Sequence, residues 1–329
     1  MKILVTGGAG FIGANYIHYI LDTQKDVQVI NLDKLTYAGN EANLQKYAED
    51  DRYTFVHGDI CDGALVNRLV KDVDLIVHFA AESHVDRSIE GPGIFLQTNI
   101  IGTQVLLDAA LKHGGKRFHH VSTDEVFGSL PADPSQKFSE TTPYDPRSPY
   151  SASKAASDHI VRAYFHTYGL PVTISNCSNN YGPYQFPEKL LPLFITNLIE
   201  GKKVPVYGTG ENVRDWIHVE DHVKGVDAVI QKGIIGETYC LGGNAEIQNI
   251  AIAHLILAEF GKGQETIEYV ADRKGHDLRY AIDFAKATRE LGWTPVHNFT
   301  DGLQQTIEWY KENEEWWKPL KDRAENRHQ

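Results

Sequence analysis

The sequence predicts an α/β protein with a doubly wound parallel sheet, followed by a smaller domain of mixed α/β structure. Short apolar runs rich in β-branched residues alternate with amphipathic stretches through the first half of the chain. Such alternation is typical of parallel strands joined by helices that cover both faces of a sheet. A glycine-rich turn follows the first run, as in Rossmann domains. After about Cys177 turns become frequent and the elements short, which indicates a second unit.

The expected elements of the first unit follow one another in a regular order. Strands are expected at residues 2–6, 27–32, 53–57, 75–79, 117–122 and 172–177, and helices at 11–21, 64–70, 95–113 and 150–168. The run at 75–79 is apolar enough for a strand buried on both faces. We expect residues 1–178 and 214–242 to form the Rossmann domain, and residues 179–213 and 243–329 to form the smaller domain.

The last part of the chain gives weaker signals. Helices are expected at 284–291, with Asp283 as N-cap, and at 301–313, with Thr300 as N-cap. The polar tail after Lys318 is expected to fray. His119 and His120 fall in a strand and are interpreted as packing residues, whereas residues 316–317, two tryptophans, fit either a core or an interface.

Composition disfavours several classes of protein. A net charge of −12 argues against general nucleic-acid binding, although a few local Arg and Lys can still attract a phosphorylated ligand. No apolar run reaches the roughly 20 residues of a membrane span, and no secretion signal is seen, so we expect a cytoplasmic protein without membrane attachment. Cys61, Cys177 and Cys240 lie far apart and the histidines show no paired metal spacing, so reduced thiols and no metal are expected.

The glycine-rich turn predicts a dinucleotide site. Residues 7–13 read Gly-Gly-Ala-Gly-Phe-Ile-Gly between a strand and a helix, where glycines let the backbone approach a pyrophosphate at the helix N-terminus. Asp33 ends the second strand, where a carboxylate binds a ribose 2′-hydroxyl and repels a 2′-phosphate. NAD is therefore expected rather than NADP, with the neighbouring Lys34 as the one opposing signal. Asp59 and Ile60 are placed to meet the adenine, although Asp59 fits a helix N-cap nearly as well.

Tyr150 and Lys154 are four residues apart, so they share one helix face. A phenol normally titrates near pH 10, too high for a general base. A neighbouring ammonium and a positive nicotinamide ring would favour the phenolate and bring its pKa toward the working pH. The pair is therefore interpreted as the base of a hydroxyl oxidation.

Two adjacent carboxylates, Asp124 and Glu125, follow Thr123 at the end of a strand. Hydride transfer needs no extra acid and base, whereas removing water from a sugar needs both. Successive strand residues point to opposite faces, so both carboxylates reach one sugar only if the chain bends near Thr123. The acid and base roles also require surroundings that separate their pKa values. The alternative is a solvated acidic pair at the start of a loop.

These motifs, together with Ala80-Ala81, resemble the extended short-chain dehydrogenase/reductase family, whose members act largely on nucleotide sugars. Segments 33–40, 80–88, 122–126, 176–184 and 214–216 are similar to the 4,6-dehydratases of that family, and the resemblance runs from residue 1 to about 317. Family epimerases carry small or apolar residues at the two positions after the Thr. The resemblance implies a recycled, tightly bound NAD, a dTDP-glucose substrate, and a homodimer formed through the helices around 95–113 and 150–168.

The resemblance also implies a role for each catalytic residue. Tyr150 takes the proton of the sugar 4-hydroxyl as hydride leaves carbon 4, and Lys154 supports its phenolate. Thr123 hydrogen-bonds the 4-oxygen and aligns Tyr150. Glu125 removes the carbon-5 proton and Asp124 protonates the departing 6-hydroxyl; hydride then returns to carbon 6, giving dTDP-4-keto-6-deoxyglucose.

Further contacts carry over residue by residue. The cofactor-binding residues are expected to be Gly7, Gly10, Phe11, Ile12, Gly13, Asp33, Lys34, Leu35, Thr36, Asp59, Ile60, Phe79, Ala80, Ala81, Ser83, Thr98, Tyr150, Lys154 and Asn180. The substrate-binding residues are expected to be His84, Thr123, Asn179, Lys189, Leu190, Pro205, Val206, Tyr207, Arg214, Asn249, Asp272, Arg273 and His276. Arg214 and Arg273 suit a diphosphate and Tyr207 can stack on a base.

Two positions depart from the family pattern, because Phe127 and Lys274 stand where Tyr and Pro are expected. Three alternatives remain beside the leading hypothesis. The chain could be another nucleotide-sugar 4,6-dehydratase, a UDP-sugar 4-epimerase or decarboxylase on the same scaffold, or a non-catalytic NAD-sensing protein that kept the fold. Asp124 and Glu125 disfavour the epimerase, and the intact catalytic set disfavours the sensor.

Overall fold

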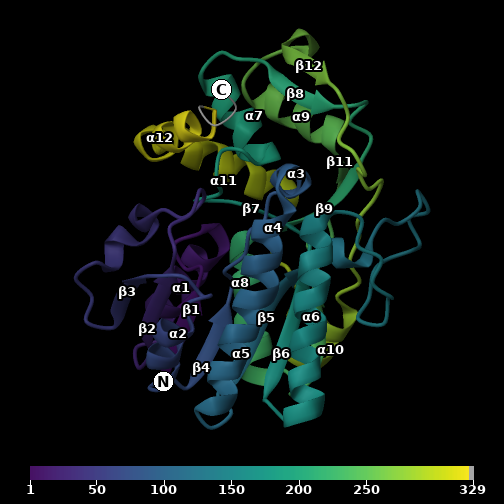
Figure 1. The fold of residues 1–329 in the computed structure, drawn as a ribbon. Coiled ribbons are helices and arrows are strands. Elements are labelled where there is room, and N and C mark those ends of the chain that lie inside the picture. The colour runs from purple at the N-terminus through teal and green to yellow at the C-terminus, as the bar shows by residue number, and fades with distance from the viewer. Residues whose placement is uncertain (326–329) are drawn as a thin grey trace.

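The structure, a computed structural model, describes residues 1–325. Its larger unit is built on a seven-stranded sheet in the order β10-β6-β5-β4-β1-β2-β3, in which every pair is parallel (Figure 1). The strands are β1 (Lys2–Thr6), β2 (Gln28–Asp33), β3 (Tyr53–His57), β4 (Leu75–His78), β5 (Arg117–Thr123), β6 (Val172–Cys177) and β10 (Thr238–Leu241). The doubly wound parallel sheet predicted from the sequence is confirmed.

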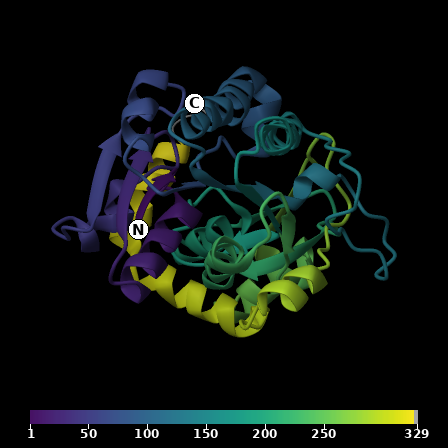
Figure 2. The same ribbon diagram turned by 90° about the horizontal axis from the view of Figure 1, so that it is seen from below.

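Side chains alternate between the two faces of this sheet, and each face has its own core. Ile3 and Val5 of β1 pack in the cluster beneath helices α1 (Phe11–Thr23) and α8 (Val219–Lys232), whereas Leu4 packs in the cluster on the other face. That second cluster lies beneath α2 (Gly63–Val70), α5 (Thr103–Lys112) and α6 (Pro149–Tyr168). Figure 2 shows helices on both sides of the strands. The order reverses between β1 and β4, so a cleft forms where their carboxyl ends diverge.

A long helical stretch joins β4 to β5. It contains α3 (Val85–Glu90), α4 (Pro92–Phe95), the π-helical turn η2 (Leu96–Gly102) and α5. Residues Pro92–Lys112 have the length and mean hydropathy, 1.3, of a membrane span, so the expectation that no segment passes this test is wrong. Phe95, Leu106 and Leu107 are buried within the larger unit, and a core helix of a globular protein satisfies the same test.

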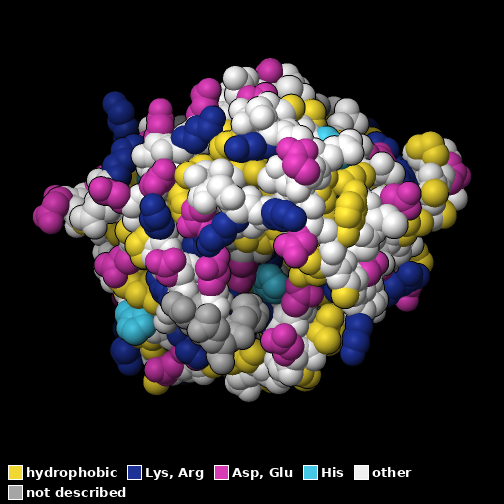
Figure 3. Space-filling model, turned by 90° about the horizontal axis from the view of Figure 1, so that it is seen from above, with side chains coloured by type: hydrophobic (Ala, Val, Ile, Leu, Met, Phe, Trp, Pro, Cys, Tyr) yellow, Lys and Arg dark blue, Asp and Glu magenta, His cyan; other side chains and the backbone are white. Residues whose placement is uncertain are grey.

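The smaller unit caps the carboxyl ends of the strands. It contains a three-stranded sheet, β11-β9-β7, and the parallel pair β12-β8. Its strands are β7 (Asn179–Tyr181), β8 (Val204–Tyr207), β9 (Val213–His218), β11 (Glu246–Gln248) and β12 (Ile267–Val270). Its helices are α7 (Leu190–Ile199), α9 (Asn249–Glu259), α11 (Phe299–Glu312) and α12 (Glu314–Glu325), and the short turn η4 (Gln264–Thr266) precedes β12. Another short turn, η1 (Glu41–Tyr47), contacts α1 of the larger unit. Seen from above, acidic and basic side chains are interspersed on its surface (Figure 3).

The division of the chain into two domains stays a proposal, and one segment of the second part packs with the first. Helix α10 (Ala285–Leu291) contacts α8 and β10, and its Ala287 and Leu291 belong to the core beneath α1 and α8. Asp283 accepts the Ala285 N–H at 2.9 Å, as a cap would, although the helix has Phe284 at its N-cap position.

Two expectations for the end of the chain are wrong. Thr300 is not the cap of α11, because the Asn298 side chain accepts the Asp301 N–H at 3.0 Å and the helix begins at Phe299. Residues 319–325 continue helix α12 instead of fraying, because Leu320 is buried and the Lys321 ammonium donates to both Asn197 and Glu200 at 2.7 Å. Residues 326–329 of the predicted frayed tail lie outside the described residues. Trp317 is fully buried in the core of the smaller unit.

We expect the fold to lose stability as the pH falls below neutrality, because several histidines are buried in the neutral form. Burial lowers the pKa of His222 to about 3 and that of His120 to about 4. A histidine in the unfolded chain titrates near pH 6.5, so between about pH 6.5 and these values the unfolded chain binds protons that the folded chain excludes. Each such histidine costs about 2 kcal/mol of unfolding free energy on going from pH 7 to pH 5.

Replacement of one of these residues measures the effect. His222 donates one hydrogen bond, from its Nδ1 to Asn180 Oδ1 at 2.8 Å, which a Gln amide can retain. The unfolding free energy of His222→Gln, measured in urea at pH 7 and pH 5, should fall by about 2 kcal/mol less than that of the unchanged protein. Equal falls in both proteins would contradict the assignment of His222 as a neutral buried group.

Candidate active site

The glycine-rich turn between β1 and α1 is packed tightly against the sheet. A Cβ on Gly7, which has φ +71°, would lie 2.6 Å from the Ala80 Cα, and one on Gly13 would lie 2.3 Å from the Gly7 carbonyl oxygen. A Cβ on Gly10 would lie 3.3 Å from the same oxygen, which is also closer than an ordinary contact. Glycines therefore let the backbone fold closely at the start of α1, as a turn that binds a pyrophosphate requires.

Asp33 is held rigidly at the end of β2. Its Oδ2 accepts the Ala9 N–H at 2.9 Å and its Oδ1 accepts the Leu35 N–H at 2.8 Å, and Leu35 has a positive φ of 51°. Lys34, the residue that weakened the prediction of NAD, is paired with Asp59 at 2.7 Å. Asp33 therefore presents its charge to the ribose position, while Lys34 is drawn away by Asp59.

One continuous cleft runs from this turn to the carboxyl ends of β5 and β6. Among the predicted cofactor residues, it is lined by Gly7, Gly10, Phe11, Ile12, Gly13, Asp33, Lys34, Thr36, Asp59, Ile60, Phe79, Ala80, Ala81, Ser83, Thr98, Tyr150, Lys154 and Asn180. Leu35 lies outside it and lines a neighbouring hollow. Thr123, Asp124, Glu125, Asn179 and Lys189 line the same cleft. The groups expected to hold cofactor and to act on the sugar thus face one space.

Helix α6 places Tyr150 and Lys154 at the end of β5. The helix starts with a reciprocal cap between Ser148 and Ser151 and a proline at its first position, Pro149, which fixes where the first turn begins. Lys154 is buried and donates to the Val121 carbonyl at 2.9 Å. Its ammonium is therefore fixed beneath the cleft and oriented along the helix face that carries Tyr150.

The pKa of Tyr150 is shifted in the direction opposite to the one expected from the sequence. Burial, followed by the charge of Glu125, raises it well above the ordinary value of a phenol. Lys154 alone therefore does not produce a phenolate near neutral pH. The second cation expected beside the phenol is the positive nicotinamide ring, which we expect to bind in the same cleft.

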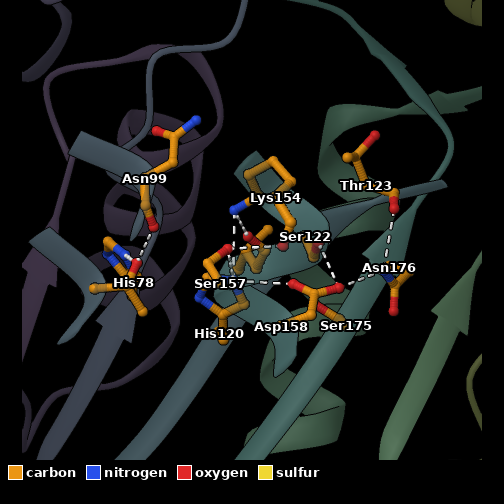
Figure 4. A network of polar contacts seen from close by, with 12 residues as sticks. His78, Asn99, His120, Ser122, Thr123, Lys154, Ser157, Asp158, Ser175 and Asn176 are labelled. Carbon is orange, nitrogen blue, oxygen red and sulfur yellow. Dashed lines mark hydrogen bonds and ion pairs between the residues drawn. The ribbon is translucent and has the colours of Figure 1, made fainter. Parts of the chain in front are cut away.

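A buried polar network beneath Lys154 was missed by the sequence reasoning (Figure 4). His120 Nε2 lies 3.1 Å from Asp158 Oδ1 and 3.5 Å from the Lys154 ammonium. Asp158 Oδ2 accepts from Ser122 at 2.9 Å, from Tyr144 at 2.8 Å and from Asn176 at 3.3 Å. Burial raises the pKa of Asp158, but the hydrogen bond from His120 and the charge of Lys154 oppose this rise, and the pKa is held below its usual range.

The two histidines of β5 therefore have different roles. His119 bonds only Thr173 at 2.9 Å and Ser175 at 3.1 Å, which confirms the prediction of a packing residue. His120 belongs instead to the network under the catalytic helix. The alternation of side chains along β5 sends these neighbours to opposite faces, and only the position of α6 tells which face carries the function.

The chain bends at Thr123, as the sequence argument required. Strand β5 ends there and the 3-10 turn η3 (Asp124–Phe127) follows, with the Thr123 hydroxyl accepting the Glu125 N–H at 3.2 Å. Asn176 donates to the Thr123 carbonyl at 3.0 Å and so ties the bend to the network (Figure 4). Both carboxylates consequently line the cleft.

The surroundings of the two carboxylates differ in charge. Burial raises the pKa of Asp124 well above its ordinary value, and the neighbouring charges of Glu125 and Asp215 raise it further. Burial also raises the pKa of Glu125, but Lys189, Arg214 and Arg273 oppose the rise. Asp124 is thereby favoured as the protonated acid and Glu125 as the ionised base.

The three cations near Glu125 come from different segments. Lys189, just before α7, donates to the Ser83 carbonyl at 3.0 Å. Arg214 of β9 stacks over the Tyr280 ring at 4.1 Å, and Arg273 lies 5.4 Å from the centre of the Tyr207 ring. Arg273 is also bound by Asp86, with its Nε at 2.6 Å, so two predicted ligand-binding residues, Arg273 and Tyr207, already contact each other.

The remaining residues predicted to bind the substrate come from several segments of the chain. His276 bonds Asp272 at 2.7 Å and meets Tyr207 edge to face. His84 lies 3.9 Å from Glu188, a half-buried carboxylate that was not predicted from the sequence. Val206 is buried in the core of the smaller unit, so its side chain does not face the cleft. Leu190, Pro205 and Asn249 stand at the starts of α7, β8 and α9.

One cluster away from the cleft has the composition of a metal site. Within the described residues, ligand atoms of His218, Glu220 and His297 lie within 4.8 Å of one another. The imidazole rings of His218 and His297 stack at 4.2 Å, and His218 Nδ1 also caps the Glu220 N–H at 3.4 Å. The separation of these residues along the chain explains why no metal spacing was visible in the sequence.

Comparison with known proteins agrees with this geometry. A family model described as GDP-mannose 4,6 dehydratase matches residues 4–306. A dTDP-glucose 4,6-dehydratase of Streptomyces antibioticus is 53% identical over 98% of this chain and 96% of its own length, and one from Escherichia coli is 50% identical over 98% and 97%. The chain belongs to the dTDP-glucose 4,6-dehydratase family.

Solved structures of a dehydratase and of an epimerase have the same fold as this chain. A dTDP-glucose 4,6-dehydratase (DesIV) from Streptomyces venezuelae, solved with NAD, is 52% identical, covers 97% of this chain and 100% of that one, and has a TM-score of 0.94. A UDP-glucose 4-epimerase from Thermotoga maritima is 30% identical, with 95% and 99% coverage and a TM-score of 0.87. The dehydratase family therefore shares its fold with epimerases, and sequence identity separates the two.

The two departures from the family pattern are accommodated locally. Phe127 is buried and stacks on Phe138 at 5.2 Å and against the edge of Tyr144 at 5.3 Å, so an aromatic cluster takes up the position. Lys274 is exposed on the loop that carries Asp272 and Arg273. Neither residue lines the cleft.

The charge of Asp33 should decide cofactor preference in this dehydratase. Asp33→Asn removes the charge and keeps one oxygen that can accept one of the Ala9 and Leu35 N–H groups, whereas Asp33→Ala removes both bonds. In both variants the affinity for NADP relative to NAD should rise by about tenfold or more, because the repulsion of a 2′-phosphate is gone. Titration of cofactor-stripped protein with each dinucleotide measures this ratio. An unchanged ratio in Asp33→Asn would mean that another residue recognises the ribose.

The network under Lys154 should be a major source of stability. Asp158→Asn removes a buried charge that binds His120 and three further donors, so we expect a loss of about 2–4 kcal/mol of unfolding free energy. Tyr144→Phe, which removes one of these donors, should cost about 1 kcal/mol. Urea unfolding of both variants checks the order, and a loss in Asp158→Asn no larger than in Tyr144→Phe would contradict a central role of this carboxylate.

Proposed function

We propose that this chain is an NAD-dependent hydro-lyase that converts dTDP-glucose into dTDP-4-keto-6-deoxyglucose. The observation that carries the proposal is the pair Asp124 and Glu125, a buried and a half-buried carboxylate in differently charged surroundings, facing one cleft with Tyr150. Relatives that are 49–53% identical over nearly the whole chain are dTDP-glucose 4,6-dehydratases. When bound, NAD accepts a hydride from carbon 4 of the sugar and returns it to carbon 6.

Tyr150 begins the reaction as a base. It takes the proton of the 4-hydroxyl, with Thr123 bonded to the same oxygen and Lys154 one helical turn further along α6. The packing of Tyr150 against the edge of Phe95, with ring centres 6.3 Å apart, keeps the phenol in one orientation. The resulting ketone makes the hydrogen on carbon 5 acidic.

Glu125 and Asp124 then remove water. Glu125 takes the carbon-5 proton, which is possible because Lys189, Arg214 and Arg273 favour its ionised form. Asp124 gives its proton to the 6-hydroxyl, and its Oδ2, which has no hydrogen-bond partner among the described residues, is available for that contact. Glu125 returns its proton to carbon 5 when carbon 6 is reduced. Both carboxylates thus act within one closed space.

The smaller unit supplies the groups that suit a nucleoside diphosphate. Arg214 and Arg273 present planar guanidinium groups that match phosphate oxygens, and the exposed ring of Tyr207 suits the face of a base. We assign the residues predicted from the sequence to these roles, with Val206 contributing through its backbone. The cofactor residues that line the cleft, together with Leu35 at its margin, hold NAD.

We also propose a homodimer in the cytoplasm. Ile94, Leu96 and Ile101, on the stretch Pro92–Lys112, and Tyr168, at the end of α6, are large apolar side chains that are exposed in the single chain. The two helical segments lie side by side, and exposed apolar side chains on neighbouring helices are suited to a protein partner. A second copy of the chain would cover these side chains.

A 4-epimerase on the same scaffold is the second candidate. It would use Tyr150, Lys154 and the cofactor site but not an acid and a base beside Thr123. The burial of Asp124 beside the half-buried Glu125 costs free energy unless the groups are used or paired, which favours the dehydratase.

The test is incubation of purified protein with dTDP-glucose without added cofactor, followed by mass spectrometry. We expect the loss of one water and no net formation of NADH, because the hydride is returned. UDP-glucose and CDP-glucose serve as controls for recognition of the base. An unchanged mass with all three sugars, also after addition of NAD, would overturn the dehydratase assignment.

Variants of the carboxylates separate the first step from the second. The double variant Asp124→Asn with Glu125→Gln should still reduce bound NAD, seen as absorbance at about 340 nm, but lose water at least about 10²-fold more slowly. Tyr150→Phe should suppress the reduction of NAD itself. Rapid dehydration by the double variant would remove these carboxylates from their roles.

A further inference from the structure

The proposed reaction leaves a proton on the wrong group at the end of each turnover. Tyr150 gains the proton of the 4-hydroxyl, whereas Asp124 loses a proton to the departing water. Glu125 gains and returns the same proton, and the hydride that leaves carbon 4 arrives at carbon 6. The chain therefore ends with a neutral Tyr150 and an ionised Asp124, and the next turnover needs the reverse.

Thr123 lies between these two groups. Its hydroxyl donates to Asp124 Oδ1 at 3.3 Å, and it also interacts with the Tyr150 phenol, which lines the same cleft. It also accepts the Glu125 N–H at 3.2 Å. A hydroxyl has one O–H and two lone pairs, so it can accept one proton while it gives up another. When the phenol is neutral, its O–H directed at Thr123, together with the Thr123 O–H directed at Asp124, would be the order of bonds that carries a proton from Tyr150 to Asp124.

Few other routes are open. Tyr150 is 8% exposed and Asp124 is 2% exposed, so bulk water reaches neither freely. Behind Tyr150, the Lys154 ammonium is buried against the Val121 carbonyl and His120. Beyond Asp124 stands Asp215, whose two oxygens accept the N–H groups of Ala245 and Gly243 at 2.9 and 3.3 Å.

One other protic side chain lies near both groups. The Cys177 thiol interacts with the charges of Asp124 and Tyr150. It donates to the Ser122 carbonyl at 3.4 Å, away from either group. Burial raises its pKa to about 12, so it releases a proton poorly. Cys177 is therefore a suitable control position, close to the path but not on it.

We propose that the Thr123 hydroxyl relays one proton from Tyr150 to Asp124 in each turnover, so that acid and base are reset inside the closed site. This inference rests on the proposed function. The phenol O–H bond breaks as its proton passes to the Thr123 oxygen, and the proton already on Thr123 passes to Asp124 Oδ1. Thr123 is unchanged, Tyr150 becomes a phenolate and Asp124 becomes a neutral acid. No other reactant is consumed.

The charges around the path act on both ends of the transfer. Transfer removes a carboxylate from beside Glu125 and Asp215, both of which disfavour it. It creates a phenolate that Glu125 also disfavours, but this phenolate lies one helical turn from Lys154, at the place where a positive nicotinamide ring is expected. The anchoring of the Thr123 carbonyl by Asn176 keeps the relay in register with both ends (Figure 4).

The test compares the first turnover with later turnovers in the same holoenzyme. Thr123→Val keeps the shape of the side chain and removes the hydroxyl, Thr123→Ser keeps the hydroxyl, and Cys177→Ala is the control. Each protein is mixed rapidly with excess dTDP-glucose, quenched at intervals, and analysed for the dehydrated sugar. Loss of substrate alignment slows every turnover alike. The ratio of the later turnover rate to the rate of the first turnover therefore measures only the proton transfer from Tyr150 to Asp124.

We expect Thr123→Val to form about one product per site and then to continue roughly 10²-fold more slowly, because proton transfer must use a poorer route. Added imidazole should accelerate the later phase but not the first, since a small buffer can carry the proton. The ratio should stay near that of the unchanged enzyme in Thr123→Ser and Cys177→Ala.

Two outcomes would overturn the relay. Equal slowing of first and later turnovers in Thr123→Val would leave Thr123 with substrate alignment only, and a burst in Cys177→Ala would move the relay to the thiol. Absence of product from the unchanged enzyme would instead contradict the proposed function. Retained NAD and circular dichroism show that the variant is folded; if it is not, Thr123→Ala replaces it in the same assay.

Discussion

The buried carboxylate of Asp158 is the contact on which the catalytic edge of the sheet depends. It joins β5 through Ser122 and His120, β6 through Asn176, and the loop before α6 through Tyr144, while itself belonging to α6. A charge buried without partners would cost several kcal/mol, so the surrounding donors cannot move independently of it. The positions of Lys154 above His120 and of Thr123 above Asn176 follow from this single centre.

The difference between Asp124 and Glu125 arises from the way two units meet. Both residues belong to one short turn of the larger unit, and burial acts on both. The arginines that oppose the rise in the pKa of Glu125 come from β9 and from the loop before Tyr280. Asp124 instead faces the carboxylate of Asp215. The segments that carry Arg214 and Arg273, which we propose bind the nucleotide, therefore also affect the pKa of Glu125, so the proposed substrate recognition and proton chemistry are coupled.

The sequence was sufficient where a local pattern carries a physical requirement. The six strands, the turn at Gly7 and Gly13, the carboxylate of Asp33 and the bend at Thr123 each follow from residues that are near one another in the chain. Contacts between distant segments could not be predicted in this way. His120 and Asp158 are individually ordinary, and only the packing of α6 on β5 makes them a pair. Likewise, Lys321 looked like part of a polar tail until α7 supplied Asn197 and Glu200 as partners.

A site that removes water from a sugar must handle water and protons without admitting solvent to a reactive ketone and a reduced cofactor. The structure meets this demand by burying the acid, and by nearly burying the phenol that acts as base. Such burial has a consequence, because groups hidden from solvent cannot exchange protons with it quickly. The hydride balances within each turnover, since it leaves carbon 4 and arrives at carbon 6. Proton balance then has to be internal as well, and the short turn that places Asp124 next to Thr123 provides the connection.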